Sequence, residues 1–205
     1  MNPNYIIPIL DELIEIYKHK KMYKFIHIPI QSASDKILKD MNRNYKSEQV
    51  IEIIKRFREE IPNITIATDI ITGYPTEKEE DHKKNLEFLE NIKPDVLNIS
   101  KFSSHKKTKA GELEPLKKSI INKRASELME VHRRTAENKK KEFLNKEINV
   151  FVNNKISTSE VYESRDDFYN IVLINSKDKS ILGKNIKVKI IKTGVHHMIG
   201  EKLKN

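Results

Sequence analysis

The 205-residue sequence contains no cysteine. These residues therefore cannot form a disulfide, and they cannot supply thiolate ligands to a metal ion or to an iron–sulfur cluster. Long hydrophobic runs are also absent, since none approaches the ~20 apolar residues that a membrane-spanning helix requires. The N-terminus lacks the basic segment and apolar core of a signal peptide. We therefore expect a cytoplasmic protein with no membrane partner and no metal site.

Acidic residues are outnumbered only in the C-terminal part of the chain. Basic and acidic side chains balance in residues 1–116, so the whole net charge of +9 lies in residues 117–205. This excess predicts a polyanionic partner such as a nucleic acid, because phosphate contacts dominate nucleic-acid affinity. A lysine-rich solvated surface is the alternative explanation, and the charge alone does not separate the two.

Strand and helix patterns alternate in residues 1–144. Apolar runs at residues 23–30, 64–71 and 96–102 predict three strands. Predicted helices begin near Asn2, Asp35, Ser47 and Thr76, where Thr76 and Glu79 have capping-box spacing. A long helix is predicted over residues 116–144. This alternation predicts a parallel sheet built from βαβ units. Three strands cannot close a barrel, so we predict the second half of a larger α/β (TIM-like) barrel. Its exposed sheet edge would favour self-association.

The pattern changes in residues 145–205. Short, alternating, β-branched segments at residues 147–152, 157–162, 167–174 and 184–191 predict a small antiparallel β-barrel that forms a second domain. Phe168, Tyr169, Lys187 and Lys189 are compatible with an oligonucleotide-binding face. The alternative is that the aromatic rings fill the core of the barrel.

Polar residues follow the first two predicted strands. In parallel α/β folds, ligands bind at the carboxyl ends of the strands. Gln31 and Ser32 come directly after the first apolar run, and Arg43 follows the next helical pattern. Asp69 and Gly73 occupy the end of the second strand. His27 lies within an apolar strand, which favours an inner-barrel residue over a ligand, and we interpret Glu77 as a carboxylate at a helix N-terminus.

Three segments resemble signatures of the radical SAM methylthiotransferases that modify tRNA. HIPIQSASDKILKDMNRNY resembles the family's HxPxQSGSdxxLxxMxRxY stretch, with Ala33 in place of the usual glycine. ATDIITGYPTEKEED resembles its TDIIxGFPxET segment. NISKFSSHKKTKAG is similar to its xFSPRPGTxAA segment but degenerate, because residues 104–107 replace Pro-Arg-Pro-Gly. The C-terminal module is similar to the TRAM domain, an OB-like RNA-binding barrel.

This resemblance implies S-adenosyl-L-methionine (SAM) as cofactor. Related enzymes bind SAM through a glutamine, an arginine twelve residues later and an aspartate on the next strand, and Gln31, Arg43 and Asp69 match that pattern. Gly73 would allow close approach of the adenine, and Ser32 is a weaker candidate. The alternatives are that Arg43 is a helix C-cap partner and that Asp69 caps a loop. The family also carries two 4Fe-4S clusters on cysteines that these residues lack, so we predict a catalytically inert fragment with no catalytic residue of its own.

The resemblance favours a fragment of a tRNA methylthiotransferase, most like archaeal members that act on N6-threonylcarbamoyladenosine. A ribosomal-protein methylthiotransferase and a non-catalytic RNA-binding protein are the alternatives. The partner implied is tRNA. Its predicted contacts lie on the long helix and on the β module: Arg133, Arg134, Lys139, Lys140, Lys187 and Lys189. The alternative for the helix is a solvated face that links the two domains.

Overall fold

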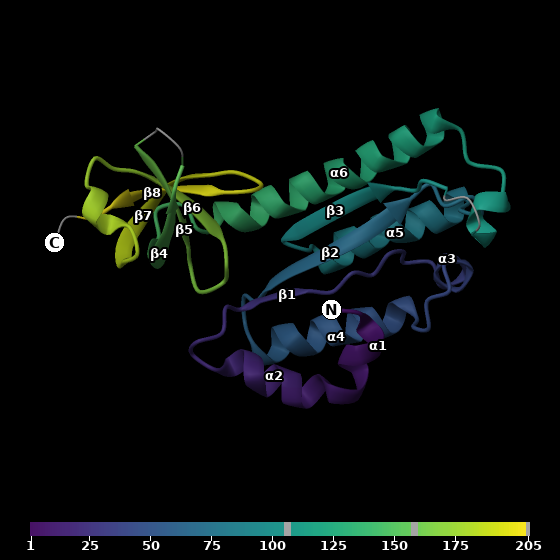
Figure 1. Ribbon diagram of the computed structural model, residues 1–205, viewed down its shortest axis with the longest axis horizontal. Coiled ribbons are helices and arrows are strands. Elements are labelled where there is room, and N and C mark those ends of the chain that lie inside the picture. The colour runs from purple at the N-terminus through teal and green to yellow at the C-terminus, as the bar shows by residue number, and fades with distance from the viewer. Residues whose placement is uncertain (105–107, 157–159, 204–205) are drawn as a thin grey trace.

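The computed structural model describes residues 1–104, 108–156 and 160–203. Two bodies are joined by one long helix (Figure 1). The first contains a three-stranded parallel sheet in the order β1-β2-β3, and the second is a closed barrel in the order β4-β5-β6-β8-β7. The helix α6 (Lys118–Lys141) packs along the sheet and ends at the barrel.

The N-terminal helix forms as predicted but is interrupted. Asn2 caps α1 (Pro3–Ile6), and its side-chain oxygen accepts a hydrogen bond from the Asn4 amide at 3.1 Å. A 3-10 turn, η1 (Ile7–Ile9), then precedes α2 (Leu10–Lys18), so the pattern predicted as one helix is broken. Pro8 lies in that turn and cannot donate the backbone hydrogen bond of a regular helix.

Three parallel strands form the sheet: β1 (Phe25–His27), β2 (Thr65–Thr72) and β3 (Val96–Lys101). Phe25 pairs with Thr65, and Asp69 pairs with Asn98. The first strand is shorter than the predicted residues 23–30, because Pro29 interrupts the ladder. Pairing resumes in a parallel bridge between Gln31 and Ile70.

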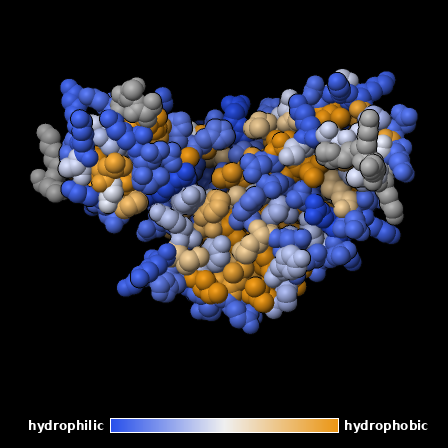
Figure 2. Space-filling view, in the orientation of Figure 1, coloured by the Kyte–Doolittle hydropathy of each residue, from blue (hydrophilic) through white to orange (hydrophobic). Residues whose placement is uncertain are grey.

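Helices cover one face of this sheet. They are α3 (Asp35–Asp40), α4 (Ser47–Glu60), α5 (Glu79–Ile92) and α6, and their apolar residues form one core with Ile26, Ile66, Ile70 and Leu97 of the strands. The opposite face carries exposed residues, including Val96 and Asn98. Figure 2 shows hydrophobic residues gathered over the sheet and the N-terminal helices. Among the described residues, the sheet has one covered face, one open face and two edges with no further strand, which is consistent with the predicted partial barrel.

Two predicted helix caps are wrong in detail. Lys46, rather than Ser47, is the N-cap of α4, and its amide donates to the Gln49 side chain at 2.9 Å. The N-cap of α5 is Lys78, whose amide donates to Asp81 at 2.9 Å. Thr76 lies before that helix, and its hydroxyl contacts Asp40. The Thr76 hydroxyl therefore donates to the Asp40 carboxylate instead of capping α5, as the sequence pattern had predicted.

The C-terminal barrel has five strands, where the sequence predicted four. They are β4 (Glu147–Lys155), β5 (Val161–Arg165), β6 (Ile171–Asn175), β7 (Asn185–Thr193) and β8 (Met198–Lys202). The pairing is antiparallel except between β6 and β8, which are parallel and close the barrel. The predicted strand at residues 157–162 begins outside the described residues. Val150, Tyr162, Ile174 and Val188 belong to a separate core.

The two bodies meet at the start of the sheet. The Lys24 amide donates to the Asp167 carbonyl at 2.8 Å, and the ring of Tyr169 lies 5.0 Å from that of Tyr23 and 5.1 Å from that of Phe25. Tyr169 therefore holds the barrel against the sheet, which the sequence did not predict. No helix in the part of the chain that the structure describes is long and apolar enough to cross a membrane.

Candidate functional site

Gln31 stands at the carboxyl end of β1 in a fixed backbone conformation. Its φ of 67° is left-handed, which is uncommon for a residue with a side chain. The Gln31 amide donates to the Asp69 carbonyl, and the Gln31 carbonyl accepts from the Ile71 amide, both at 2.9 Å. The Gln31 side chain makes no hydrogen bond within the described residues. It is therefore a positioned donor and acceptor at the strand end, as a ligand-binding amide requires.

Asp69 lies on the open face of the sheet between two neighbours. Its Oδ1 accepts hydrogen bonds from His27 Nε2 and from Asn98 Nδ2, both at 2.8 Å. The Asp69 side chain keeps 27% of its surface exposed, and that of His27 keeps 40%. His27 is thus hydrogen-bonded on the open face with a partly exposed side chain, and Asn98 was not predicted as a neighbour of Asp69. The second carboxylate oxygen of Asp69 has no protein donor among the described residues.

Arg43 carries an unsatisfied donor. Its Nε is buried and has no hydrogen-bond partner within the described residues. A buried N–H without an acceptor costs about 1–3 kcal/mol, so a polar ligand that reaches this atom would be favoured. The Arg43 amide donates to the Leu38 carbonyl at 2.8 Å, which fixes the backbone after α3. A cofactor carboxylate fits this forked donor.

Gly73 ends β2 in a turn that only glycine fits. Its φ is 83°, and a Cβ added there would lie 2.7 Å from Ile121 Cγ1 of α6. The Gly73 amide donates to Glu77 Oε2 at 2.6 Å. The turn is thus held from one side by a carboxylate and from the other by the long helix.

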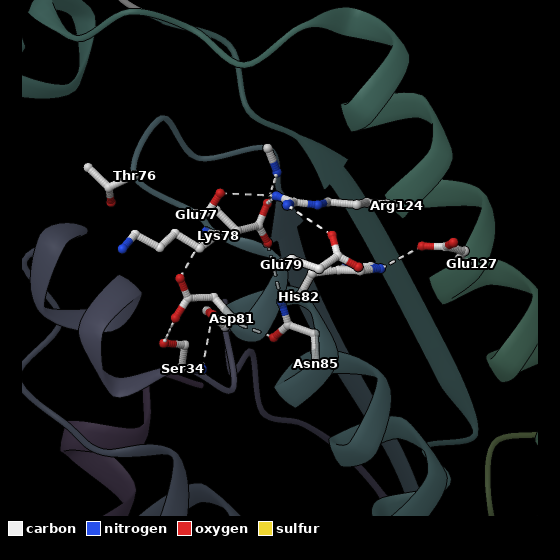
Figure 3. A network of polar contacts seen from close by, with 12 residues as sticks. Ser34, Thr76, Glu77, Lys78, Glu79, Asp81, His82, Asn85, Arg124 and Glu127 are labelled. Atoms are coloured by element: carbon white, nitrogen blue, oxygen red, sulfur yellow. Dashed lines mark hydrogen bonds and ion pairs between the residues drawn. The ribbon is translucent and has the colours of Figure 1, made fainter.

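A buried ion pair fixes that carboxylate (Figure 3). Glu77 Oε2 lies 3.0 Å from Arg124 Nη1, with 1% and 7% of the two side chains exposed. The same Nη1 donates to the Glu77 carbonyl at 3.1 Å, and Nη2 lies 3.4 Å from Glu79. Glu77 lies directly before the N-cap of α5, near the predicted helix N-terminus, but it is buried and pairs with Arg124, 47 residues away, which was not predicted. No local pattern indicated Arg124.

Further polar contacts connect this pair to the loop after β1. Asn85 Oδ1 accepts from the Ala33 amide at 2.6 Å, and the Ser34 hydroxyl donates to Asp81 at 2.6 Å. Burial would raise the pKa of Asp81, but the hydrogen bond from Ser34 and other donors lower it. Ser32 is fully buried, and its hydroxyl faces Asn85 at 3.5 Å. The Ser32 side chain therefore lies in this supporting network rather than at the open strand end.

The cations predicted to bind RNA differ in accessibility. Lys140 is buried and donates to Asn170 at 2.6 Å, so it is a structural residue between α6 and the barrel. Burial lowers its pKa, and burial raises that of the nearby Asp166. The others lie at or near the surface, most of them paired: Lys139 with Asp95, Arg134 with Glu90, Arg133 with Glu137 and Lys187 with Glu147. Lys189 is exposed.

No group of three or more His, Cys, Asp or Glu side chains within residues 1–104, 108–156 and 160–203 could hold a metal ion. The polar groups near the carboxyl ends of β1 and β2 can contact an organic ligand. They offer an amide, a carboxylate oxygen, a guanidinium and a glycine turn, which match the ribose, carboxylate and adenine of a nucleoside-based cofactor.

Comparison with known proteins identifies relatives over most of the chain. A family model described as the radical SAM superfamily matches residues 2–89. A probable threonylcarbamoyladenosine tRNA methylthiotransferase of Archaeoglobus fulgidus is 33% identical over 201 residues, which are 98% of this chain and 46% of that protein. The threonylcarbamoyladenosine tRNA methylthiotransferase of Xenopus laevis is 36% identical over 200 residues, which are 98% of this chain and 35% of that protein.

The chain spans less than half the length of these relatives. The superfamily match includes Gln31, Asp69 and Gly73 of the β1 and β2 region and Arg43 of the segment after α3. The two relatives match almost the whole chain, sheet and barrel together. By sequence, the chain therefore belongs to the radical SAM tRNA methylthiotransferase family.

Proposed function

We propose that this chain is the C-terminal part of an enzyme that adds a methylthio group to C2 of N6-threonylcarbamoyladenosine beside the anticodon of tRNA. The similarity to relatives named for threonylcarbamoyladenosine tRNA, over 98% of the chain, carries the proposal. The activity is assigned to the whole enzyme, because the chain spans less than half of those relatives.

The strand ends hold SAM in this proposal. Arg43 donates to the methionine carboxylate, and its unpartnered buried Nε is the observation that supports this role. Gln31 contacts the ribose or the methionine end, and Asp69 accepts through its free oxygen. The Gly73 turn is placed beside the adenine in this proposal. When bound, SAM would supply the radical chemistry that removes hydrogen from the target adenine.

The cleavage itself lies outside this chain. The chain contains no cysteine, so it holds neither of the two 4Fe-4S clusters that the reaction requires. We therefore propose that the isolated chain is catalytically inert. Reductive SAM cleavage by these 205 residues alone would contradict this.

Cofactor binding can be measured on the isolated chain. Isothermal titration calorimetry with S-adenosylhomocysteine, which cannot be cleaved in the same way, is expected to show binding to the wild type. Arg43→Met should weaken it at least about tenfold, because a hydrogen bond to a charged group contributes about 1.5–3 kcal/mol. Arg56→Met is the control, since Arg56 pairs with Asp11 on the surface of α4. Equal affinities in both variants would remove Arg43 from the site.

The barrel is proposed to be an RNA-binding TRAM module, with Lys187, Lys189 and Arg133 contributing to a tRNA surface in a cytoplasmic enzyme. Mass analysis of tRNA nucleosides from a strain that lacks the gene tests the reaction. Loss of the methylthio group from threonylcarbamoyladenosine is the expected result. Unchanged nucleosides would favour a protein substrate or a non-catalytic RNA-binding role.

A further inference from the structure

A groove lies where the loop after α2 meets the outer surface of the barrel. Its volume is about 360 Å³, and it is lined by residues 20–23 of the loop and by Asn149, Phe151 and Asn185 of β4 and β7. The hydrogen bond from the Lys24 amide to the Asp167 carbonyl and the contact between Tyr23 and Tyr169 join its two walls. Figure 1 shows this loop running to the barrel. The groove therefore exists only because the two bodies are docked.

The charge in this groove is mainly positive. Lys20 and Lys21 are exposed, and neither has an acidic partner within the described residues. Arg165 also lines the groove, pairs with Glu163 at 2.9 Å and lies over the Tyr169 ring at 4.3 Å. Asp167 is the acidic residue of the lining. Two unpaired lysines beside an arginine favour a phosphate-bearing ligand.

Two aromatic rings are left exposed at the same place. Tyr23 keeps 41% of its surface exposed and Phe151 keeps 37%, although large apolar side chains are usually buried. A ring that faces solvent beside a cationic surface is a platform on which a base can stack. A base stacks in this way only when it is unpaired and pulled out of a helix.

Free amide groups lie beside the rings. The side chains of Asn149 and Asn185 are exposed and make no hydrogen bond within the described residues. Strand pairing places Phe151 opposite Asn185 and Asn149 opposite Lys187. An amide both donates and accepts, so it can pair with the edge of an unstacked base. Beyond the amides and the Phe151 ring, the same pair of strands, β4 and β7, leads to Lys187 and Lys189.

We propose that this shared groove binds an unpaired, unstacked segment of RNA, with bases on Phe151 and Tyr23 and phosphates on Lys20 and Lys21. The inference rests on the proposed function in taking tRNA as the partner. It adds a binding element from the α/β body, the loop after α2, to the surface otherwise assigned to the barrel. A duplex would use only the lysines, because its bases are stacked and cannot reach the rings.

Fluorescence anisotropy on the 205-residue chain tests the groove with two labelled probes, an eight-nucleotide single-stranded RNA and an RNA duplex of eight base pairs. Phe151→Ala should weaken single-strand binding at least about fivefold and leave duplex binding unchanged, and Phe151→Trp should restore it. Lys20→Ala/Lys21→Ala should weaken binding of both probes. It should also reduce the slope of log affinity against log salt by about 1.4 for the single strand.

Lys83→Ala/Lys84→Ala is the matched control, because it removes an adjacent pair of exposed lysines from α5. Thermal unfolding checks that every variant is folded. Single-strand affinity that is unchanged in both groove variants, or lost equally in the control, would overturn the inference. So would binding of anionic lipid vesicles that competes with the RNA and depends equally on Phe151.

Transfer RNA as a third probe separates this inference from the proposed function. If the wild type binds tRNA and the groove variants bind it equally well, only the groove is wrong. If the wild type binds neither tRNA nor the single strand, both proposals fail.

Discussion

The buried pair of Glu77 and Arg124 offers the sharpest test of how the Gly73 turn is held. Arg124→Met keeps an unbranched side chain of similar reach and removes the charge. Glu77 would then remain 1% exposed as a carboxylate, with the Gly73 amide at 2.6 Å and Asn85 at 3.5 Å as its remaining donors. Removing one partner of a buried ion pair typically costs about 3–5 kcal/mol.

The remaining donors reduce this cost, so we expect Arg124→Met to lower the free energy of unfolding by about 3 kcal/mol. For a chain of this length, that corresponds to a fall in Tm of roughly 6–12 °C. Glu77→Gln/Arg124→Met should be less destabilised than the sum of the single variants. The double variant leaves no unpaired buried charge, and the introduced side-chain amide can still accept from the Gly73 amide.

Equilibrium urea unfolding followed by circular dichroism measures these values. Arg133→Met is the control on the same helix, since Arg133 is exposed and pairs with Glu137 one turn away, and it should change stability by less than about 0.5 kcal/mol. A cost below about 1 kcal/mol for Arg124→Met, or strict additivity in the double variant, would refute the assignment of the pair as the support of the turn.

Three further perturbations test other parts of the fold. Gly73→Ala should destabilise the chain by about 2–4 kcal/mol through its left-handed φ and the clash with Ile121, and adding Ile121→Ala should recover only the steric part. Burial lowers the pKa of Lys140, so the charged form of its side chain is penalised in the folded state. The free energy of unfolding should therefore rise with pH in the range just below 10.5. Lys140→Met should lose that rise when unfolding is measured as a function of pH. The open sheet edges should make the chain self-associate, so its sedimentation coefficient in sedimentation velocity should rise with protein concentration.

Each of these has a contrary result. Full recovery by Ile121→Ala would show that backbone strain at Gly73 is negligible. Parallel pH profiles of Lys140→Met and the wild type would show that Lys140 reaches water. A sedimentation coefficient independent of concentration would show that the edges do not drive association.

Local patterns predicted much of the fold. The alternation of strands and helices gave the parallel sheet, and Asn2 with Pro3 gave the first cap, because both depend on residues close in sequence. The errors had two causes. Asp40, 36 residues away, accepts the hydrogen bond of the Thr76 hydroxyl. Pro29, within the predicted strand itself, interrupts the ladder and shortens the first strand. The parallel pairing of β6 with β8 joins strands separated by β7, so no local turn indicated it.

The family resemblance predicted Gln31 and Asp69 as cofactor residues, and in the structure the Gln31 amide donates to the Asp69 carbonyl. Their support was not foreseen. Arg124 and Asn98 carry no local signal, because a charged or amide residue in a helix or a strand is normally solvated. The same reason made Lys140 resemble a surface cation.

The sequence by itself determined the absence of thiolate ligands and the alternation of strands and helices in the first body, and its motifs predicted Gln31, Arg43 and Asp69 as cofactor residues. Tertiary structure alone decided which charges are buried and which surfaces combine. Arg124 reaches Glu77 and Lys140 reaches Asn170 because the long helix packs along the sheet and ends at the barrel. Burial depends on neighbours that lie tens of residues away, and periodicity or spacing along the chain does not record those neighbours.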